Sequence, residues 1–179
     1  MRRIAAILLC LILGLISLEH LVKAGVLHVP TGTWASGGAM VQPRAGASAV
    51  LLQDGRVLIT GGDIGTGPTA TADFVANDGS TSAAPLMGAP RSSHISVVLQ
   101  DGRVLVAGGL TSGGVANSAE IFDPTLNSWS GVAGGLVEAR AGAAAVLLND
   151  GRVLITGGQG PSGTVSQSAE IFDPASEAF

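Results

Sequence analysis

The 179-residue sequence has one cysteine, one lysine, no tyrosine and only 3% aromatic residues. A single cysteine, Cys10, cannot form a disulfide within the chain, so stability has to come from a packed core or from a partner chain. Only 12% of the residues are charged and they form no cluster of either sign, which argues against nucleic acid and anionic membranes as partners. The scarcity of Lys and the 27 glycines, among many Val, Ala, Ser and Thr, argue against long helices and indicate β structure.

The amino-terminal segment has the layout of a secretory signal peptide. Arg2 and Arg3 precede an apolar run at 4–18, which is shorter than the roughly 20 residues of a spanning helix. The stretch "VKA" at 22–24 has small residues at the positions that signal peptidase reads, which predicts cleavage after Ala24. We therefore expect a secreted protein, extracellular or periplasmic, with no membrane contact after cleavage. An uncleaved anchor is the alternative. Of the nine Lys and Arg, three lie in residues 1–24, as does one of the thirteen acids, which leaves six arginines against twelve acids.

The rest of the sequence repeats itself with a period of 47–50 residues. The stretch "DGRVLITGG" at 54–62 returns unchanged at 150–158 and as "DGRVLVAGG" at 101–109, and "SAEIFDP" at 118–124 recurs at 168–174. We therefore divide the chain into an entry segment at 25–43 and three repeats at 44–90, 91–139 and 140–179. The residues that we expect to have structural roles in the repeats are Asp54, Gly55, Gly61, Gly62, Asp101, Gly102, Gly108, Gly109, Trp129, Asp150, Gly151, Gly157 and Gly158.

Each repeat can be divided into four strands. Asp54-Gly55 between two apolar runs predicts a hairpin with a type I′ turn, so the first two strands are expected to be antiparallel neighbours. The glycine pair ends the second strand, a loop rich in Gly, Ser and Thr follows, and "AEIF" forms the third strand. Trp129 marks the fourth strand, and Trp34, in the entry segment, is expected to belong to an isolated fourth strand.

Apolar runs such as "SAVLL" and "AAVLL" lack the alternation of a sheet with one wet face, so both faces of each sheet should be covered. Four-stranded sheets of this kind are best covered by stacking radially around an axis. Small residues in the first strands suit the crowded innermost position, and Trp129 suits an outer strand. The sequence therefore predicts an all-β protein of the β-propeller type, with about three four-stranded blades.

These features resemble the kelch repeat, with its arginine opening the first strand, its double glycine, its "EIFDP" third strand and its tryptophan in the fourth strand. The wording "LLxDGRVLxxGG" is similar to secreted bacterial kelch proteins and to the propeller of the galactose oxidase group. The latter resemblance implies a copper site built from tyrosines, a cysteine and histidines. Because the chain has no tyrosine and its cysteine lies in the signal segment, these 179 residues do not form a radical copper oxidase.

Three blades are too few for a closed ring. We expect either a fragment of a longer gene product or self-association of two chains into a six-bladed ring. In the second case, the Trp34 segment would supply a fourth strand to a partner's last blade.

Candidate ligand-binding residues are few. Arg44, Arg91 and Arg140 could form a positive ring that binds carboxylates, and Asp63 lies beside them at a glycine pair. The alternative is that the arginines pair with third-strand acids such as Glu120 and Glu170 and tie blade to blade. His94, where the other copies have alanine, could bind a ligand or be a hydrogen-bonded core residue.

No metal or cofactor is expected, because Asp54 and its equivalents fit turns and no metal-ligand pattern flanks them. Nucleophile-elbow, phosphate-loop and zinc-protease motifs are absent from the sequence. We therefore expect a non-catalytic scaffold that binds a protein or glycan through the variable loops at 62–71, 109–117 and 158–167. The alternative is the propeller part of a carbohydrate-active or oxidase-type enzyme with its catalytic residues elsewhere.

Overall fold

A computed structural model describes residues 39–179 of the chain. The predicted signal peptide at 1–24, Trp34 and most of the entry segment at 25–43 lie outside the described residues. Every regular element of the described part is a β-strand, as the composition predicts. Within this part there is no helix long and apolar enough to cross a membrane.

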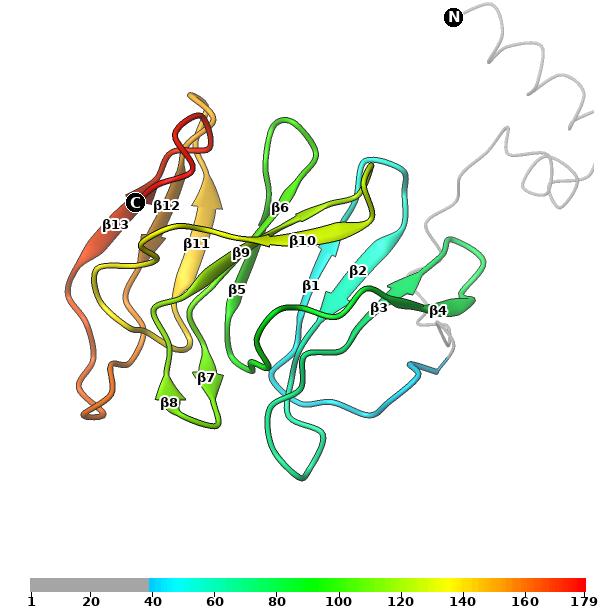
Figure 1. Ribbon diagram of the computed structural model, residues 1–179, viewed down its shortest axis with the longest axis horizontal. Coiled ribbons are helices and arrows are strands. Elements are labelled where there is room, and N and C mark those ends of the chain that lie inside the picture. The colour runs from blue at the N-terminus through cyan, green and yellow to red at the C-terminus, as the bar shows by residue number, and fades with distance from the viewer. Residues whose placement is uncertain (1–38) are drawn as a thin grey trace, which may run out of the picture. The chain divides into compact units, whose positions relative to one another are not determined.

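Most of the strands form three larger antiparallel sheets, which we call blades 1, 2 and 3, and two short strands form a small separate hairpin (Figure 1). Blade 1 contains β1 (Ser48–Leu51), β2 (Val57–Thr60), β3 (Ala72–Val75) and β4 (Thr81–Ala84). Blade 2 contains β5 (Ile95–Val98), β6 (Val104–Ala107), β9 (Ala119–Asp123) and β10 (Ser128–Gly131), with the small hairpin β7 (Leu110–Thr111) and β8 (Gly114–Val115) in the loop after β6. Blade 3 contains β11 (Ala144–Leu147), β12 (Val153–Thr156) and β13 (Ala169–Phe172). Strands that follow one another within a blade pair with one another, as the hairpin signals predict.

Blade 3 has three strands rather than four. After β13 the chain turns back and forms an isolated bridge between Asp173 and Ala178. The ring of Phe179 nevertheless lies 5.1 Å from that of Phe172, much as Trp129 lies 5.0 Å from Phe122 in blade 2. An aromatic ring therefore covers the third strand in both blades.

The first strands of the three blades lie next to one another, β1 beside β5 and β5 beside β11. This is the innermost position that their small residues predict. Two apolar clusters fill the spaces between the blades. Leu58 and Phe74 of blade 1 pack with Val104 and Phe122 of blade 2. A second cluster joins blade 2 to blade 3 through residues such as Leu105, Ile121, Val153, Ile155 and Phe172.

Only blade 2 has both faces covered within the described residues, and all four residues of β6 are buried. The prediction of two covered faces therefore holds for blade 2. The outward faces of blades 1 and 3 carry exposed apolar side chains such as Leu51 and Val146.

The prediction of a type I′ turn at Asp54-Gly55 is wrong. The Gly55 amide donates to the carbonyl of Leu52, the Leu52 amide donates to the carbonyl of Arg56, and only Gly55 of the two central residues has a positive φ, of 88°. This is a three-residue loop with a type I turn and a glycine bulge. Asp54 instead accepts a hydrogen bond from the Arg56 amide through its side chain, and the same pattern recurs at Asp101 and Asp150.

Neighbouring blades are joined at the glycine pairs. The Gly62 amide donates to the carbonyl of Arg91, and the Gly109 amide donates to the carbonyl of Arg140, both over 2.9 Å. A Cβ atom on Gly108 would lie only 2.4 Å from the Arg140 carbonyl oxygen. The close approach of the next blade therefore requires glycine here. We call this contact between a glycine pair and the following arginine carbonyl the latch.

Candidate functional site

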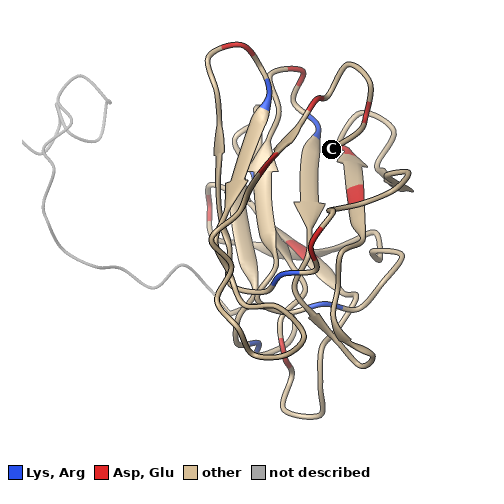
Figure 2. Cartoon of the chain, turned by 90° about the vertical axis from the view of Figure 1, so that its left-hand side faces the viewer, with Lys and Arg blue, Asp and Glu red and all other residues tan. Residues whose placement is uncertain are grey.

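The loops that join the second to the third strand of each blade gather at one end of the described unit (Figure 1). We call this the loop end. The Asp-Gly hairpins lie at the opposite end, and Figure 2 shows basic residues toward both ends of the sheets. The loop end contains all of the candidate ligand-binding residues except His94, which lies nearby between blades 1 and 2.

The three arginines that open the repeats are buried at the loop end. In blade 2, Nη1 of Arg91 donates to the carbonyls of Gly108 and Ser118, and Nη2 lies 2.7 Å from a carboxylate oxygen of Glu120. Arg44 with Asp73, and Arg140 with Glu170, repeat this arrangement. All three arginine side chains are at most 1% exposed. The terminal nitrogens of the guanidinium groups are therefore occupied by the protein's own carbonyls and carboxylates, whereas Nε of Arg44 and of Arg91 has no hydrogen-bond partner among the described residues.

The arginines of blades 2 and 3 pair with Glu120 and Glu170, as expected. The expectation that these ion pairs join one blade to the next is wrong. Arg91 and Glu120 both belong to blade 2, and the pair joins the start of β5 to β9. Glu120 also accepts hydrogen bonds from the amides of Gly88 and Ala89, which lie in the connection from blade 1. The ion pair therefore fixes a blade and its incoming connection, whereas the backbone latch joins consecutive blades.

Asp63 organises its own loop. Its Oδ1 atom accepts hydrogen bonds from the amides of Gly65 and Gly67, at 2.7 and 3.3 Å. Its backbone forms bridges with Ala45 and Pro68. These contacts shape the loop at 62–71.

His94 is 7% exposed and lies between blades 1 and 2. Its Nε2 atom is 2.8 Å from Oγ1 of Thr60, while Nδ1 has no hydrogen-bond partner among the described residues. Burial, assisted by the nearby charge of Arg91, lowers the pKa of His94 to about 4. The imidazole is therefore neutral at physiological pH and forms part of the contact between blades.

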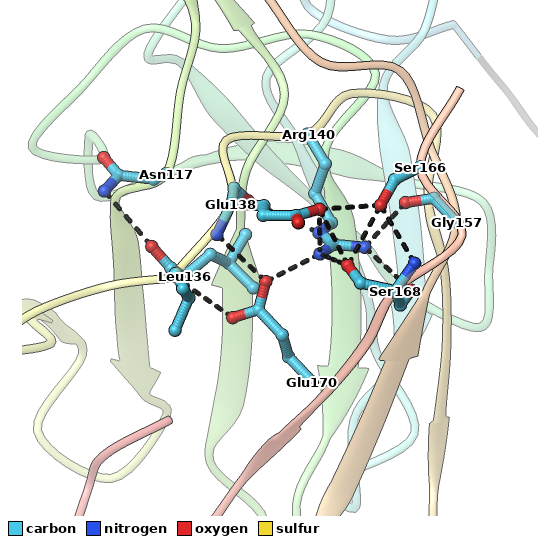
Figure 3. A network of polar contacts seen from close by, with 9 residues as sticks. Asn117, Leu136, Glu138, Arg140, Gly157, Ser166, Ser168 and Glu170 are labelled. Carbon is cyan, nitrogen blue, oxygen red and sulfur yellow. Dashed lines mark hydrogen bonds and ion pairs between the residues drawn. The ribbon is translucent and has the colours of Figure 1, made fainter. Parts of the chain in front are cut away.

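Glu138 is not among the site residues that the sequence predicts. In Figure 3 its carboxylate lies between Arg140 and the two serines Ser166 and Ser168. Both serine hydroxyls donate to Oε2 of Glu138 over 2.7 Å, and Nη2 of Arg140 lies 3.4 Å from the same oxygen. The hydrogen bond from the Ser166 hydroxyl is the largest cause that lowers the pKa of Glu138, and the hydrogen bond from Ser168 is the second. The other oxygen, Oε1, has no hydrogen-bond partner among the described residues.

Glu138 borders a hollow of about 670 Å³ at the loop end of blade 3. The Glu138 side chain is 53% exposed, so its carboxylate is held in place and yet accessible to solvent. The hollow is lined by Glu138, Ala139, Gly160, Pro161, Thr164, Val165, Ser166, Gln167 and Ser168.

The three repeats differ at the position of Glu138. Two residues before the arginine that opens the repeat, Gln42 precedes blade 1 and lies near Thr71, whereas Ala89 precedes blade 2. Blade 2 is a complete four-stranded sheet with both faces covered, although alanine occupies this position before it. The blade architecture therefore does not require a polar side chain here. Comparison of the copies could have singled out Glu138, because it is an acid that the repeat does not need.

Within residues 39–179, no group of three or more His, Cys, Asp or Glu could hold a metal ion. Asp54, Asp101 and Asp150 each pair with the arginine two residues later, Arg56, Arg103 or Arg152. The hydrogen bond from the Arg56 side chain is the largest cause that lowers the pKa of Asp54.

Comparisons with known proteins agree with this architecture. A model of the kelch motif matches residues 91–134, which span most of blade 2. The solved structure titled "Structure of YjhT" is similar with a TM-score of 0.67 and 19% identity, over 79% of this chain and 52% of that chain. The present chain thus spans about half the length of that protein. A search of curated proteins found no match. Residues 91–134 thus match the kelch motif, and the described residues fold into consecutive blades of a kelch-type β-propeller.

Proposed function

We propose that the chain is an exported, non-catalytic scaffold that binds a protein partner through its loop end. Kelch propellers generally mediate protein interactions. The loops at 62–71, 109–117 and 158–167 differ between copies, while the strands that carry them are alike. A rigid scaffold with variable loops provides specificity without disturbing the core.

The observation that carries the proposal is the free carboxylate oxygen of Glu138. Three contacts on Oε2 hold the group, so its orientation is set before a ligand arrives. The charge of Arg140 is already matched by the buried carboxylate of Glu170, at 2.6 Å. Glu138 therefore adds a net negative charge to the wall of the hollow.

A partner that donates hydrogen bonds and carries a positive charge fits this wall best. A lysine ammonium needs one accessible acceptor oxygen and is a compact charge, which matches the single free oxygen. Serine and threonine hydroxyls in the hollow provide further polar contacts. We therefore propose that the partner inserts a lysine side chain beside Glu138.

A glycan could also donate hydroxyl groups to Glu138. Trp129 is the only tryptophan among residues 39–179, and its indole packs against Phe122, with Nε1 bonded to the carbonyl of Pro85. The hollow thus lacks a large aromatic ring on which a sugar could stack. This favours the protein partner.

The test is titration of the isotope-labelled full-length chain with two blocked tripeptides, acetyl-Gly-Lys-Gly-amide and its acetyl-lysine counterpart. Binding is measured by the NMR chemical shifts of the backbone amides. The lysine peptide should shift Thr164, Ser166 and Ser168, and the acetylated peptide should not. Glu138→Gln should abolish the shifts, whereas Asp78→Asn, at an exposed turn of blade 1, should preserve them. Shifts that survive Glu138→Gln, or that appear only with maltohexaose, would contradict the proposal.

A further inference from the structure

Four hairpin turns of the chain contain an Asp-Gly pair and have the same backbone. Three of them, at 54–55, 101–102 and 150–151, join the first two strands of a blade, and the fourth, at 78–79, joins β3 to β4. In each turn the glycine amide donates to the carbonyl three residues earlier, over 2.9 to 3.0 Å. The four glycines have φ values of 81° to 89°. The side chains of the four turns can therefore be compared on one backbone.

An arginine two residues after the aspartate distinguishes three of these turns from the fourth. Its amide donates to Oδ1 of the aspartate, and its Nε atom donates to Oδ2 over 2.7 to 2.9 Å, in a set formed by Arg56, Arg103 and Arg152. Asp78 has Ser80 at this place. The Ser80 amide donates to Oδ1 of Asp78 over 2.9 Å, and the Ser80 hydroxyl is the largest cause that lowers the pKa of Asp78. Among the described residues, Asp78 therefore has no cationic partner, whereas the other three aspartates are each in an ion pair.

An aspartate that precedes glycine can close a succinimide ring, because glycine has no Cβ to hinder the approach of its own amide nitrogen. The Gly79 nitrogen attacks Cγ of Asp78, and the amide proton and the hydroxyl of the protonated carboxyl group leave as water. A second water molecule then opens the ring at either carbonyl. The product is aspartate again or isoaspartate, in which the main chain runs through Cγ. One water leaves and one returns, so the reaction requires no other reactant.

We propose that Asp78 and Gly79 are a site of isoaspartate formation, and that the arginine two residues after the aspartate protects the three equivalent turns. An ion pair keeps a carboxylate ionised, and an ionised carboxylate does not lose water. It also holds both oxygens, so the carboxyl group has to leave its partners before Cγ turns toward the glycine nitrogen. Because these pairs are exposed and individually weak, the expected protection is about two- to fivefold in rate.

The test is incubation of the full-length chain at physiological pH and temperature, followed by digestion with trypsin. Trypsin cuts after arginine, so the four turns lie in separate peptides, which end at Arg56, Arg91, Arg103 and Arg152. Mass spectrometry with electron-transfer fragmentation distinguishes isoaspartate from aspartate in each peptide. Isoaspartate should accumulate about two- to fivefold faster at Asp78 than at the other three aspartates. In guanidinium chloride, which unfolds the chain and screens the ion pairs, the four rates should become equal.

Three variants test the role of the arginine. Arg152→Ser gives the turn of blade 3 the Asp-Gly-Ser sequence of the fourth turn and should raise the rate at Asp150 to that at Asp78. Ser80→Arg should lower the rate at Asp78. Asp78→Asn is the positive control, because the same ring closes from asparagine with loss of ammonia in place of water.

Three results would overturn the proposal. They are equal rates at the four aspartates of the folded chain, an excess at Asp78 that persists in guanidinium chloride, and the lack of isoaspartate at residue 78 of the wild type. An unchanged rate at Asp150 in Arg152→Ser would contradict the protective role of the arginine. The peptide titration on Glu138 reports on the loop end, opposite the Asp-Gly hairpins, and is read separately.

Discussion

Nη2 of Arg91 lies 2.7 Å from a carboxylate oxygen of Glu120, with both side chains almost fully buried in blade 2. The backbone carbonyl of the same arginine accepts a hydrogen bond from the Gly62 amide of blade 1. One residue thus completes its own sheet through its side chain and joins the preceding sheet through its backbone. The recurrence of arginine at this point of each repeat has an architectural cause, which also explains why exchange for lysine would not be conservative.

Breaking this ion pair should be costly. Glu120→Gln leaves the Arg91 charge buried without its counter-charge and should lower the free energy of unfolding by about 3–5 kcal/mol. Arg152→Gln breaks the Arg152–Asp150 pair, which is solvent-exposed and screened, and should lower the free energy of unfolding far less than Glu120→Gln does. Urea unfolding, followed by circular dichroism at one fixed protein concentration, measures both variants. Equal losses in the two variants would show that burial of the Arg91 pair has no energetic consequence.

His94 should make the stability of the protein depend on pH. Its pKa is about 4 in the folded chain, against 6.5 as the ordinary value, so the unfolded chain binds the proton more tightly. The stabilisation that depends on the neutral imidazole is complete above pH 6.5 and is lost as the pH falls toward 4, by about 3 kcal/mol in total.

The matched variant is His94→Ala, because the other two repeats have alanine at this position. The free energy of unfolding of wild type and variant should be compared between pH 7 and pH 4. Carboxylates contribute to both curves, so the expected result is a smaller loss in the variant, by the amount assigned to His94. Parallel curves would mean that the histidine titrates alike in the folded and unfolded chains.

Gly108→Ala should destabilise the protein by forcing blades 2 and 3 apart. The new Cβ would lie 2.4 Å from the Arg140 carbonyl oxygen, at a φ of 67°. Gly134→Ala is the control, since Gly134 has a φ of 81° and no neighbour within 4 Å of a built Cβ. We expect about 1–2 kcal/mol of loss from the backbone conformation in both variants, and about 1–3 kcal/mol more from overpacking in Gly108→Ala. Equal thermal unfolding midpoints would contradict the role of the latch.

The sequence predicted the strands and their pairing well, because three aligned copies fix the strand positions and the uninterrupted apolar runs indicate sheets that stack. It did not predict the turn type at Asp54-Gly55. An Asp-Gly pair fits both the two-residue turn and the bulged turn, and the choice depends on which residues pair across the hairpin. The prediction that both faces of a sheet are covered holds for blade 2, because blade 2 has a neighbouring blade on each side.

The candidate site was harder to predict than the fold. The repeat identified Glu120 and Glu170 as partners of the arginines, but a period along the chain cannot show whether a contact lies within one blade or between two. Glu138 was not predicted because it lies at a variable position, and its role depends on Ser166 and Ser168, which follow it by 28 and 30 residues in the sequence. Likewise, Ser93 has a positive φ of 52° where the other copies have Gly46 and Gly142, which only the backbone reveals.

The latch has a consequence for how such a chain changes in evolution. Every repeat carries both halves of the latch. Its glycine pair can contact the next repeat, and the carbonyl of its first arginine can contact the preceding repeat. Tandem duplication or deletion of one whole repeat therefore produces a new junction with the same chemistry as the old ones, and the number of repeats can change without any new joint having to arise.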